Sequence, residues 1–479
     1  MTALIYEPSP TENFEAKAME YFAEVIIDKS LIHSAGFGAR SIPTYVGEWI
    51  LSRYLEDGQF VESSRHKVAQ FIAKYLPSKG QKDEIKDILL RQNVVKLLDD
   101  YSVSVNLKTG TRHLRIPFLD INDGMLQTQI VDQNSLLLSS GVWGVGELYY
   151  IPPDGEDHPR GEVWMRDFKP FQVGALDLEY FIECRQNFTL DEWRNLLISS
   201  MGFNPTIYSA RQKVVLLTRL LPLVEPRLNL VELAPKGTGK SFVYDNVSRY
   251  GRVISGGKVS SPVLFHHQVT QTPGLVTRYD AVIFDEVQSI SGDDELMAGL
   301  KIYLESGKYA RGNTEGTAEA GLVMLGNITM DDNRQPLYLD QGIFKEMPNF
   351  LCETAFVDRI HGIIPGWEMP RVSKDTPSHS LGFKGDFFSE VLHQLRGSVS
   401  YMDYVKINMQ LEGCNDLRDR NAITRLASAY LKLYFPDMKP TPDEFREYCV
   451  KPAVELRQRV RDELHKMDME YAEVSIRAL

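Results

Sequence analysis

The stretch that decides the fold is LNLVELAPKGTGKSFVYDN, residues 228–246. An apolar run leads into a glycine-containing turn, and the residues after the turn have helical character. Such a turn points consecutive backbone N–H groups inward and faces a helix N-terminus toward an anion. Lys240 would bridge the β- and γ-phosphates of ATP, and Ser241 would ligate Mg²⁺. The residues expected to hold the nucleotide are Pro235, Lys236, Gly237, Thr238, Gly239, Lys240, Ser241 and Phe242.

One residue departs from the usual spelling of such a loop. Ala234 occupies the position where the pattern has its first glycine. That position has to permit a turn, and alanine carries the smallest side chain after glycine. We therefore expect a working loop despite the alanine.

A second stretch, AVIFDE (residues 281–286), supports the same site. It reads as a buried strand that ends in two acids. Asp285 would hold Mg²⁺, directly or through water, and Glu286 would polarise the attacking water. A core strand that ends in surface acids by chance is the alternative.

The next apolar run, GLVMLGN (residues 321–327), ends in Asn327. In a parallel sheet its tip is expected beside the two nucleotide strands, where a polar side chain would orient water and sense the γ-phosphate. An ordinary asparagine in a turn is the alternative.

Two arginines are candidates for completing the site. Arg359 precedes another apolar strand, and in ring ATPases an arginine at this place reaches the γ-phosphate bound by the adjacent subunit. A structural ion pair with Asp358 is the alternative. Arg418 begins a helix and is expected to contact phosphates from a lid; Arg420 is nearly as good a candidate.

YARGNTEGTAEA (residues 309–320) reads as a hairpin inserted before the Asn327 strand. It resembles the hairpin that ring-shaped DNA translocases, such as the minichromosome-maintenance helicases, point into their pore. Lys308 and Arg311 are the candidate DNA phosphate contacts, and a solvated surface hairpin is the alternative. The aromatic-hydrophobic-glycine triplet of protein unfoldases occurs only at residues 45–47, far from the phosphate loop, and is read as a coincidence.

From residue 228 onward, short apolar strands alternate with helices, which predicts a parallel, helix-covered sheet. Capping boxes at Thr189–Glu192 and Thr441–Glu444 mark helix starts, a further helix is expected over about 208–221, and Pro452 opens the last helix. The final residues, 469–479, switch to strand-like alternation at Ala472, Val474 and Ile476.

The segment before residue 185 is expected to be mixed α+β. Residues 14–100 look mostly helical, and residues 102–121 suggest a hairpin around a Thr-Gly turn. Residues 62–118 carry 11 Lys/Arg against 6 Asp/Glu. A patch that binds nucleic-acid phosphates and a solvated helix face are both compatible with this excess.

The whole chain has 479 residues and a formal net charge of −12, which weakens any picture of a protein coated with positive charge. Its four cysteines are scattered without metal-ligand spacing and are expected to be reduced. No apolar run reaches membrane-span length, and the first residues lack a signal-peptide layout, so a cytoplasmic protein without membrane contact is expected.

These stretches together resemble one family, the Lon-related AAA+ ATPases (BrxL) of bacterial BREX phage-exclusion systems. The resemblance rests on residues 229–242, VISGGKVS, AVIFDEV, YLESGKYARG and VMLGN, and on N-terminal pieces such as SIPTYVGEWILSRY. It implies an α/β fold, namely an AAA+ P-loop module with a helical lid after a mixed α+β N-terminal domain. It also implies hexameric rings or double hexamers, duplex DNA binding without strong sequence readout, and work with other BREX proteins against phage.

The resemblance also implies a division of the chain. Residues 1–185 would form the N-terminal, candidate DNA-binding domain, 186–380 the AAA+ core and 381–468 the helical lid. Residues 469–479 would begin the Lon-like domain into which family members usually continue. The expected cofactors are ATP and Mg²⁺. We see no motif for Ser-Lys peptidase chemistry. A protein remodeller and a nucleotide-dependent scaffold are the alternatives to a DNA-directed ATPase.

Overall fold

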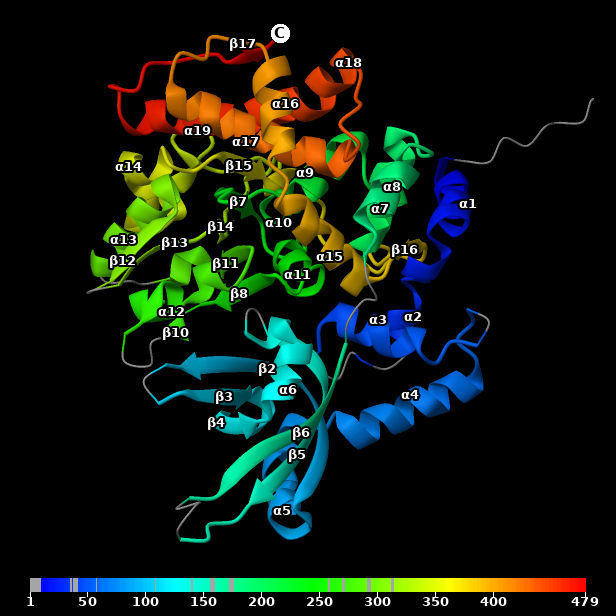
Figure 1. Cartoon of the computed structure of the whole chain (residues 1–479). Coiled ribbons are helices and arrows are strands. Elements are labelled where there is room, and N and C mark those ends of the chain that lie inside the picture. Colours follow the sequence, from blue (N-terminus) through cyan, green and yellow to red (C-terminus); the bar gives the residue numbers. More distant parts are fainter. Residues whose placement is uncertain are drawn as a thin grey trace, which may run out of the picture. The chain divides into compact units, whose positions relative to one another are not determined.

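The computed structural model describes residues 10–34, 37, 42–56, 58–107, 109–138, 141–155, 160–171, 176–256, 259–268, 272–290, 294–311 and 314–479 (Figure 1). The chain forms two compact units. Unit 1 comprises residues 1–30, 175–268 and 273–479, and unit 2 comprises residues 31–174 and 269–272. Each unit is described by itself below.

Unit 1 is built on a five-stranded sheet in which every neighbouring pair is parallel. Across the sheet the order is β15 (Gly362–Pro365), β7 (Leu230–Ala234), β14 (Gly321–Asn327), β11 (Ala281–Asp285) and β8 (Gly251–Ser255). The predicted strands and their parallel arrangement are confirmed. The strand β14 lies between β7 and β11, as expected of the strand that ends in Asn327.

The sheet is buried on both faces, which is why its central strands read as near-continuous apolar runs. All five residues of β7 are buried, and so are the first six of β14. Helix α11 (Lys240–Asn246) comes after β7 in the chain, and α13 (Asp294–Ser306) comes after β11. Helix α19 (Lys451–Met467) contacts β15. Val460 and Leu464 of α19 belong to the same core.

Four helices precede the sheet: α7 (Leu178–Arg185), α8 (Leu190–Ser200), α9 (Ala210–Thr218) and α10 (Leu221–Val224). The capping box that opens α8 is present, with Thr189 accepting from the backbone N–H of Glu192 and Glu192 bonding back. The helix expected over 208–221 ends earlier, at Thr218, and Pro222 lies in the first turn of α10, where proline is tolerated.

The first described helix, α1 (Pro10–Phe22), belongs to unit 1 although it is far from the sheet in sequence. Phe22 packs edge-on against Phe383 at a centroid distance of 4.9 Å and lies beside Trp193 of α8. Strand β1 (Ile26–Asp28) pairs antiparallel with β16 (Leu381–Phe383). Contacts therefore join residues 10–30 and 176–185 to unit 1, while the functional division at residue 185 stays a prediction.

A helical region follows β16. It consists of α15 (Gly385–Arg396), α16 (Ser400–Asn408), α17 (Leu417–Tyr434), α18 (Pro442–Phe445), a π-helical turn (Arg446–Val450) and α19. The capping box predicted at Thr441 and Glu444 is formed. Figure 1 draws these helices in orange and red.

The tail of the chain corrects one expectation. Residues 472–476, all of them described, form no strand. Strand β18 (Arg477–Ala478) instead pairs antiparallel with β17 (Leu411–Glu412), and the backbone N–H of Ile476 donates to Gln458 of α19. The alternation at the end of the sequence thus reflects packing of the tail on the helical region.

The predicted hairpin between α13 and β14 is present. Strand β12 (Lys308–Arg311) pairs antiparallel with β13 (Thr314–Thr317), so that Lys308 is opposite Thr317. The other short elements of this region are α12 (Ser261–Leu264), β9 (His266–His267), β10 (Thr272–Pro273) and α14 (Thr354–Val357).

Unit 2 combines helices with a closed barrel. Its helices are α2 (Leu31–Ser34), α3 (Thr44–Ser52), α4 (Glu62–Tyr75), α5 (Lys82–Gln92) and α6 (Thr128–Gln133). The barrel strands are β2 (Val94–Asn106), β3 (Thr111–Ile116), β4 (Ile121–Leu126), β5 (Val142–Ile151) and β6 (Glu162–Pro170). The mixture of helices and a small β unit is as predicted, and β2 and β3 form the predicted hairpin.

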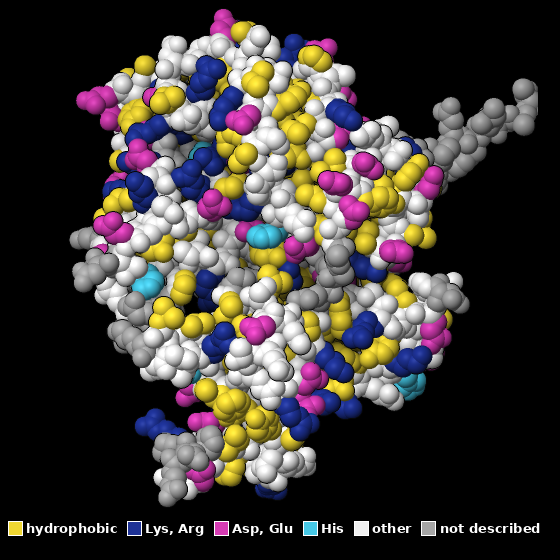
Figure 2. Space-filling view, in the orientation of Figure 1, with side chains coloured by type: hydrophobic (Ala, Val, Ile, Leu, Met, Phe, Trp, Pro, Cys, Tyr) yellow, Lys and Arg dark blue, Asp and Glu magenta, His cyan; other side chains and the backbone are white. Residues whose placement is uncertain are grey.

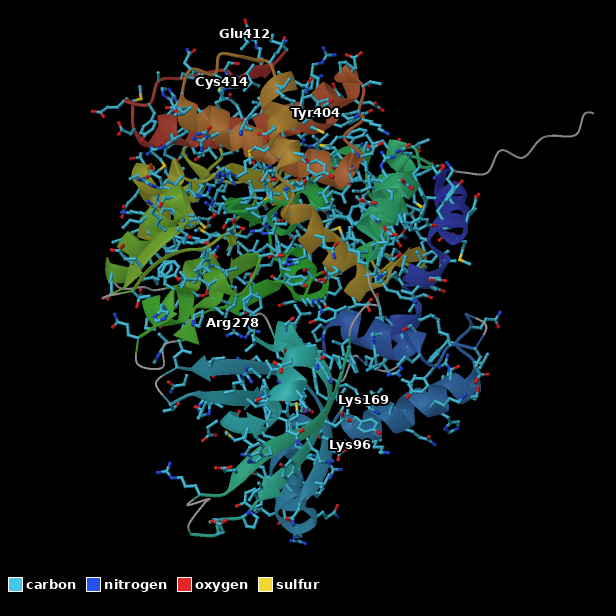
Figure 3. The ribbon with its side chains drawn as sticks, viewed as in Figure 1. Lys96, Lys169, Arg278, Tyr404, Glu412 and Cys414 are labelled. Atoms are coloured by element: carbon cyan, nitrogen blue, oxygen red, sulfur yellow. The ribbon has the colours of Figure 1, made fainter. Side chains whose placement is uncertain are left out.

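The barrel closes in the order β2-β3-β4-β6-β5, with β5 returning to β2. Its interior holds Tyr101, Leu114, Leu148 and Met165, all of which are fully buried. Figure 3 shows Lys96 and Lys169 on strands of this barrel, and both side chains are exposed. Within the described part of the chain, no helix has the length and apolar character that a membrane span requires.

Candidate functional site

The turn after β7 has the backbone of a phosphate-binding loop. Gly237 has φ 82° and Gly239 has φ 73°, a left-handed conformation that favours glycine at both positions. Gly239 is the N-cap of α11, so Lys240 and Ser241 are the first two residues of that helix. The strand–turn–helix context that the sequence predicts is therefore present.

Ala234 fits this loop because the position is still part of β7. Its backbone is not left-handed, its side chain is fully buried, and its carbonyl accepts from the N–H of Ile328 at 3.2 Å. The facing residue is Gly366, where an added Cβ would lie 2.7 Å from the Ala234 Cβ. The room for the alanine methyl group is thus provided by a glycine on another segment.

Lys240 and Asn327 are in direct contact. The Lys240 Nζ donates to Asn327 Oδ1 at 2.7 Å, and Lys240 is only 6% exposed. Burial lowers the pKa of Lys240, while the carboxylates of Glu232 and Asp285 act in the opposite direction. A buried ammonium group with nearby acids is suited to meet an incoming polyanion.

Asp285 and Glu286 lie at the same edge of the sheet. Asp285 is the last residue of β11 and is partly buried, and its Oδ1 accepts from the Glu286 N–H at 2.9 Å. Glu286 is exposed and has φ 51° and ψ 52°, a conformation that non-glycine residues adopt rarely. Such backbone strain is typical of functional sites. Two residues on, the Gln288 side chain donates to the Asn327 carbonyl.

A buried ion pair that was not predicted from the sequence supports the phosphate loop. Arg219, the C-cap residue of α9, and Glu232 of β7 are both fully buried, and Arg219 Nη2 donates to Glu232 Oε1 at 2.6 Å. Arg219 also approaches the Thr238 carbonyl at 3.4 Å. The signal was a charged residue in the middle of an otherwise apolar strand, since a buried acid requires a partner.

Aromatic side chains stand beside the loop and were also missed, apart from Phe242. Phe203 meets Phe242 edge-on at 5.6 Å and Tyr208 at 6.4 Å. A Cβ on Gly239 would lie 3.4 Å from Phe203 and 3.3 Å from Val372. Phe242 is 41% exposed, so an aromatic surface is open next to the turn.

Arg359 and Arg418 lie elsewhere. Arg359 follows α14 and precedes β15, and the N–H of His361 donates to the carbonyl of Asn229 at the start of β7. These arginines are therefore at the amino edge of the parallel strands, while the phosphate loop is at the carboxyl edge. The structure does not bring Arg418 or Arg359 to the phosphate loop of the same chain.

The two arginines share one carboxylate. Arg359 Nε donates to Glu305 Oε2 at 2.8 Å, and Arg418 Nη2 donates to Glu305 Oε1 at 2.9 Å. Asp358, which was the expected alternative partner of Arg359, instead accepts from Arg418 and from Arg457. Glu305 gave no signal in the sequence, because an acid near a helix end is common on protein surfaces.

These side chains border a groove of about 980 Å³ between the amino edge and the helical region, and Arg420 also lines it. Figure 2 shows Lys and Arg side chains interspersed with Asp and Glu on this face of unit 1, near α14 and α17. The groove is thus strongly charged, and its lining has an excess of cations, nine Lys and Arg against five Asp and Glu.

The two candidate DNA contacts belong to β12. Lys308 is the first residue of that strand, and its side chain is exposed. Arg311 is opposite Thr314 in the hairpin register, and its side chain is outside the described part of the structure. Both assignments remain predictions.

The carboxyl edge therefore gathers the lysine, one strand-end asparagine and two strand-end acids. This donor set suits a nucleoside triphosphate with Mg²⁺: an ammonium for phosphate oxygens, and a hydroxyl and a carboxylate for the metal. Ser241 and Asp285 would hold the ion, and the metal would neutralise phosphate charge. The roles assigned to the individual residues stay predictions.

Comparison with known proteins agrees with this reading. Residues 163–477 match the family described as "Lon-like protease BrxL-like, ATPase domain", and residues 20–150 match "BREX system Lon protease-like protein BrxL N-terminal". The ATPase region implies the use of a nucleotide. The chain is also 27% identical over 203 residues to the uncharacterized protein ORF426 of Acidianus filamentous virus 1, covering 36% of this chain and 47% of that protein.

Two longer matches carry the name "Lon-like protease BrxL". The protein of Escherichia coli O9:H4 (strain HS) is 30% identical over 462 residues, which cover 95% of this chain and 66% of that protein. The protein of Bacillus cereus (strain H3081.97) is 29% identical over 470 residues, which cover 97% of this chain and 68% of that protein. The chain thus spans about two thirds of the length of these relatives. From its phosphate loop to its two matching regions, the chain belongs to the BrxL family of BREX systems.

Proposed function

We propose that this protein is a ring-forming AAA+ ATPase that couples ATP binding and hydrolysis to binding DNA or moving along it in bacterial defence against phage. The observation that carries the proposal is the grouping of Lys240, Asn327 and Asp285 at one edge of a parallel sheet. Membership of a BREX family supports the setting in phage defence.

Each residue at the carboxyl edge has a role in the proposed reaction. Lys240 leaves Asn327 for the phosphates when ATP enters, which frees the asparagine to orient water and sense the γ-phosphate. Glu286 polarises that water, and its left-handed backbone directs the residue away from the line of β11. Phe242 offers an apolar surface to the base, and the buried Phe203 packs edge-on against it.

The arginines support assembly as part of the proposal. The position of Arg359 and Arg418 at the amino edge, where both contact Glu305, supports a role at a nucleotide bound by another subunit. An arginine supplied in trans stabilises transition-state charge only when subunits associate. Arg418 is therefore proposed to act in trans beside Arg359, in place of the lid role that the sequence favoured.

DNA is proposed as the macromolecule on which the ATPase acts, through two surfaces. The first is the β12–β13 hairpin, where Lys308 is exposed and Arg311 is three residues on. Contacts of this kind bind phosphates without reading sequence, and in a ring each subunit repeats them.

The second surface is the barrel of unit 2. Its strand order, with β4 parallel to β6 and helix α6 between β4 and β5, resembles the OB-fold. OB barrels bind oligonucleotides on their second and third strands, which here are β3 and β4. Arg115 is exposed on β3, and His113 is on the same face of that strand. Because of this likeness, the barrel is the better of the two candidate surfaces for binding single-stranded DNA.

Two other functions stay open to the same test. A protein remodeller would use the ATPase on polypeptides, and a nucleotide-dependent scaffold would recruit other BREX proteins with slow turnover. The relatives are named proteases, but we propose no peptidase activity for these residues, because the sequence has no Ser-Lys peptidase motif.

The decisive experiment measures ATP hydrolysis with duplex DNA, single-stranded DNA or unfolded protein added. We expect stimulation by DNA. Stimulation by unfolded protein alone would reject the DNA proposal in favour of the remodeller, and no stimulation by any of the three would favour the scaffold. Glu286→Gln serves as the reference variant, which should bind ATP normally and turn it over at least about a hundredfold more slowly. Unchanged turnover would remove the role given to Glu286.

A further inference from the structure

Glu305 is the single carboxylate on which both arginines of the amino edge converge. Arg359 approaches Glu305 Oε2 with two guanidinium nitrogens, Nε at 2.8 Å and Nη2 at 2.5 Å. Arg418 takes the other oxygen, Oε1, at 2.9 Å. Charge-assisted bonds of this kind are shorter and stronger than bonds between neutral groups.

The two arginines depend on Glu305 to different degrees. Arg418 has a second carboxylate in Asp358, which Arg457 in turn holds from a buried position. Arg359 has only a backbone carbonyl besides Glu305, that of Ala355, among the bonds of the described residues. Loss of the Glu305 charge would therefore release Arg359 and leave Arg418 anchored.

Glu305 also lies at the base of the hairpin. It is the next-to-last residue of α13, and β12 begins only three residues later at Lys308. Gly307 between them has φ 71°, its N–H donates to the Tyr303 carbonyl, and its own carbonyl accepts from Ala318 across the hairpin. The end of the helix and the base of the hairpin are thus hydrogen-bonded to each other.

The connection between α13 and β12 has little free space around it. A Cβ on Gly307 would lie 2.6 Å from Arg227 Cδ and 2.9 Å from the Ala318 carbonyl. Arg227 in turn donates to the carbonyl of Ser306, the residue beside Glu305, at 2.7 Å. A displacement of the hairpin therefore has to move the end of α13, because close-packed groups transmit displacement instead of absorbing it.

We propose that Glu305 is a positioning residue that links the hairpin to the arginine offered to a neighbouring subunit. This inference rests on the proposed function, in which Arg359 acts in trans and the hairpin contacts DNA. In the state described here Glu305 neutralises Arg359 and holds it on its own subunit. Engagement of the hairpin shifts the end of α13, weakens the Glu305–Arg359 pair and frees the guanidinium for the neighbouring ATP.

The test compares ATP turnover of Glu305→Gln with that of wild type, with and without duplex DNA. Glutamine keeps the shape of the side chain and removes the charge that retains Arg359. We expect the rate without DNA to rise at least threefold, the rate with saturating DNA to stay within twofold of wild type, and the DNA stimulation ratio to fall toward one. The KM for ATP should not change.

The matched control is Glu353→Gln. Glu353 pairs with Lys301 on the same helix α13 but contacts neither arginine, so the stimulation ratio should stay at the wild-type value. Glu305→Asp keeps the charge on a shorter side chain and should restore most of the stimulation ratio.

Two results would overturn the inference: a stimulation ratio in Glu305→Gln equal to that of wild type, or equal losses of rate with and without DNA. The second result would mean that Glu305 holds Arg359 in its productive position. If Glu305→Gln fails to assemble, Glu305→Ala is measured in its place, and a stimulation ratio equal to that of wild type without any rise in the DNA-free rate counts against the linkage.

Failure of the proposed function itself would look different. If Arg359→Ala hydrolyses ATP at the wild-type rate, the action of Arg359 in trans is wrong whatever Glu305 does. If wild type shows no stimulation by DNA, the DNA proposal fails, and a higher DNA-free rate in Glu305→Gln still tests whether Glu305 retains the arginine.

Discussion

The two edges of the five-stranded sheet are opposites in chemistry. At the carboxyl edge, Lys240, Asn327 and Asp285 leave groups that a nucleotide and a metal ion would engage. At the amino edge, Arg359 and Arg418 already have carboxylate partners. The first edge offers groups for a ligand, while at the second edge these two arginines are already paired.

Under the proposed function, this difference would divide the work between subunits. The proposed phosphate and metal ligands all belong to one chain, so ATP binding is expected to require no partner. The guanidinium groups that would stabilise transition-state charge lie on the opposite edge, so hydrolysis is expected to depend on association. The following predictions test that division, from the largest expected effect to the smallest.

Removal of the Lys240 side chain should weaken ATP binding and abolish ATP hydrolysis at the carboxyl edge. We expect Lys240→Ala to lose ATP hydrolysis to background and ATP affinity by at least about a hundredfold, because its ammonium is the main cation that faces the phosphates. Nucleotide binding by fluorescence and turnover by phosphate release measure the two losses. The exposed Lys374→Ala on a nearby segment is the control. Retention of ATP affinity in Lys240→Ala would contradict the assignment of this edge.

Removal of the arginine should affect hydrolysis but not binding. We expect Arg359→Ala to lose about 10³-fold in turnover while binding ATP normally. Mixed with Lys240→Ala, it should regain part of the activity, because a mixed interface combines an intact phosphate loop with an intact arginine. No recovery, with both variants shown to co-assemble, would contradict action in trans.

The amino edge should also be the more acid-sensitive part of unit 1. Burial and the charges of Arg425 and Arg457 lower the pKa of His361 well below its usual 6.5. The native state then binds fewer protons than the unfolded state, so stability is lost as the pH falls below 6.5, by up to about 1.4 kcal/mol per pH unit. Calorimetric melting between pH 5 and 8 measures this slope.

Two variants identify the source of that slope. His361→Asn should flatten it, while His379→Asn, which replaces an exposed histidine, should leave it unchanged. Equal slopes in wild type and His361→Asn would show that the acid sensitivity arises elsewhere.

The smallest effect is expected at Ala234, which occupies the position of the first glycine in the usual phosphate-loop pattern. Ala234→Gly should change ATP affinity less than twofold and cost about 1 kcal/mol of stability, because it removes a buried methyl group from a strand. The reciprocal change, Gly366→Ala, should cost more, since its Cβ would lie 2.7 Å from both Ala234 and Glu232. A tenfold gain in ATP affinity in Ala234→Gly would show that alanine impairs the loop.

Much of the carboxyl edge could be predicted from sequence, for a local reason. Strand, turn and helix are contiguous between residues 228 and 246, and Asp285 and Asn327 each end a strand of the same parallel sheet. Parallel strands bring their carboxyl ends to one edge, so the meeting of Lys240 with Asn327 follows from the pattern alone.

The amino edge could not be predicted in the same way. Glu305 meets arginines that are 54 and 113 positions away, and nothing in the local sequence selects one surface acid over another. The role of Gly366 in accommodating Ala234 and the attachment of α1 to unit 1 depend on packing over still larger separations. The tail misled for the opposite reason, since its alternation reflects contact with α19 and not a strand.

The adjacency of β7 and β15 has a consequence for how force would pass through an assembly. The two strands are hydrogen-bonded over four residues, roughly 13 Å of extended chain, with Arg359 before the one and the phosphate loop after the other. A push on the arginine would reach the next phosphate loop along a short, stiff strut. Because the strands are parallel, the arginine and the phosphate loop lie at opposite ends of that strut, so a change at either end would be felt at the other.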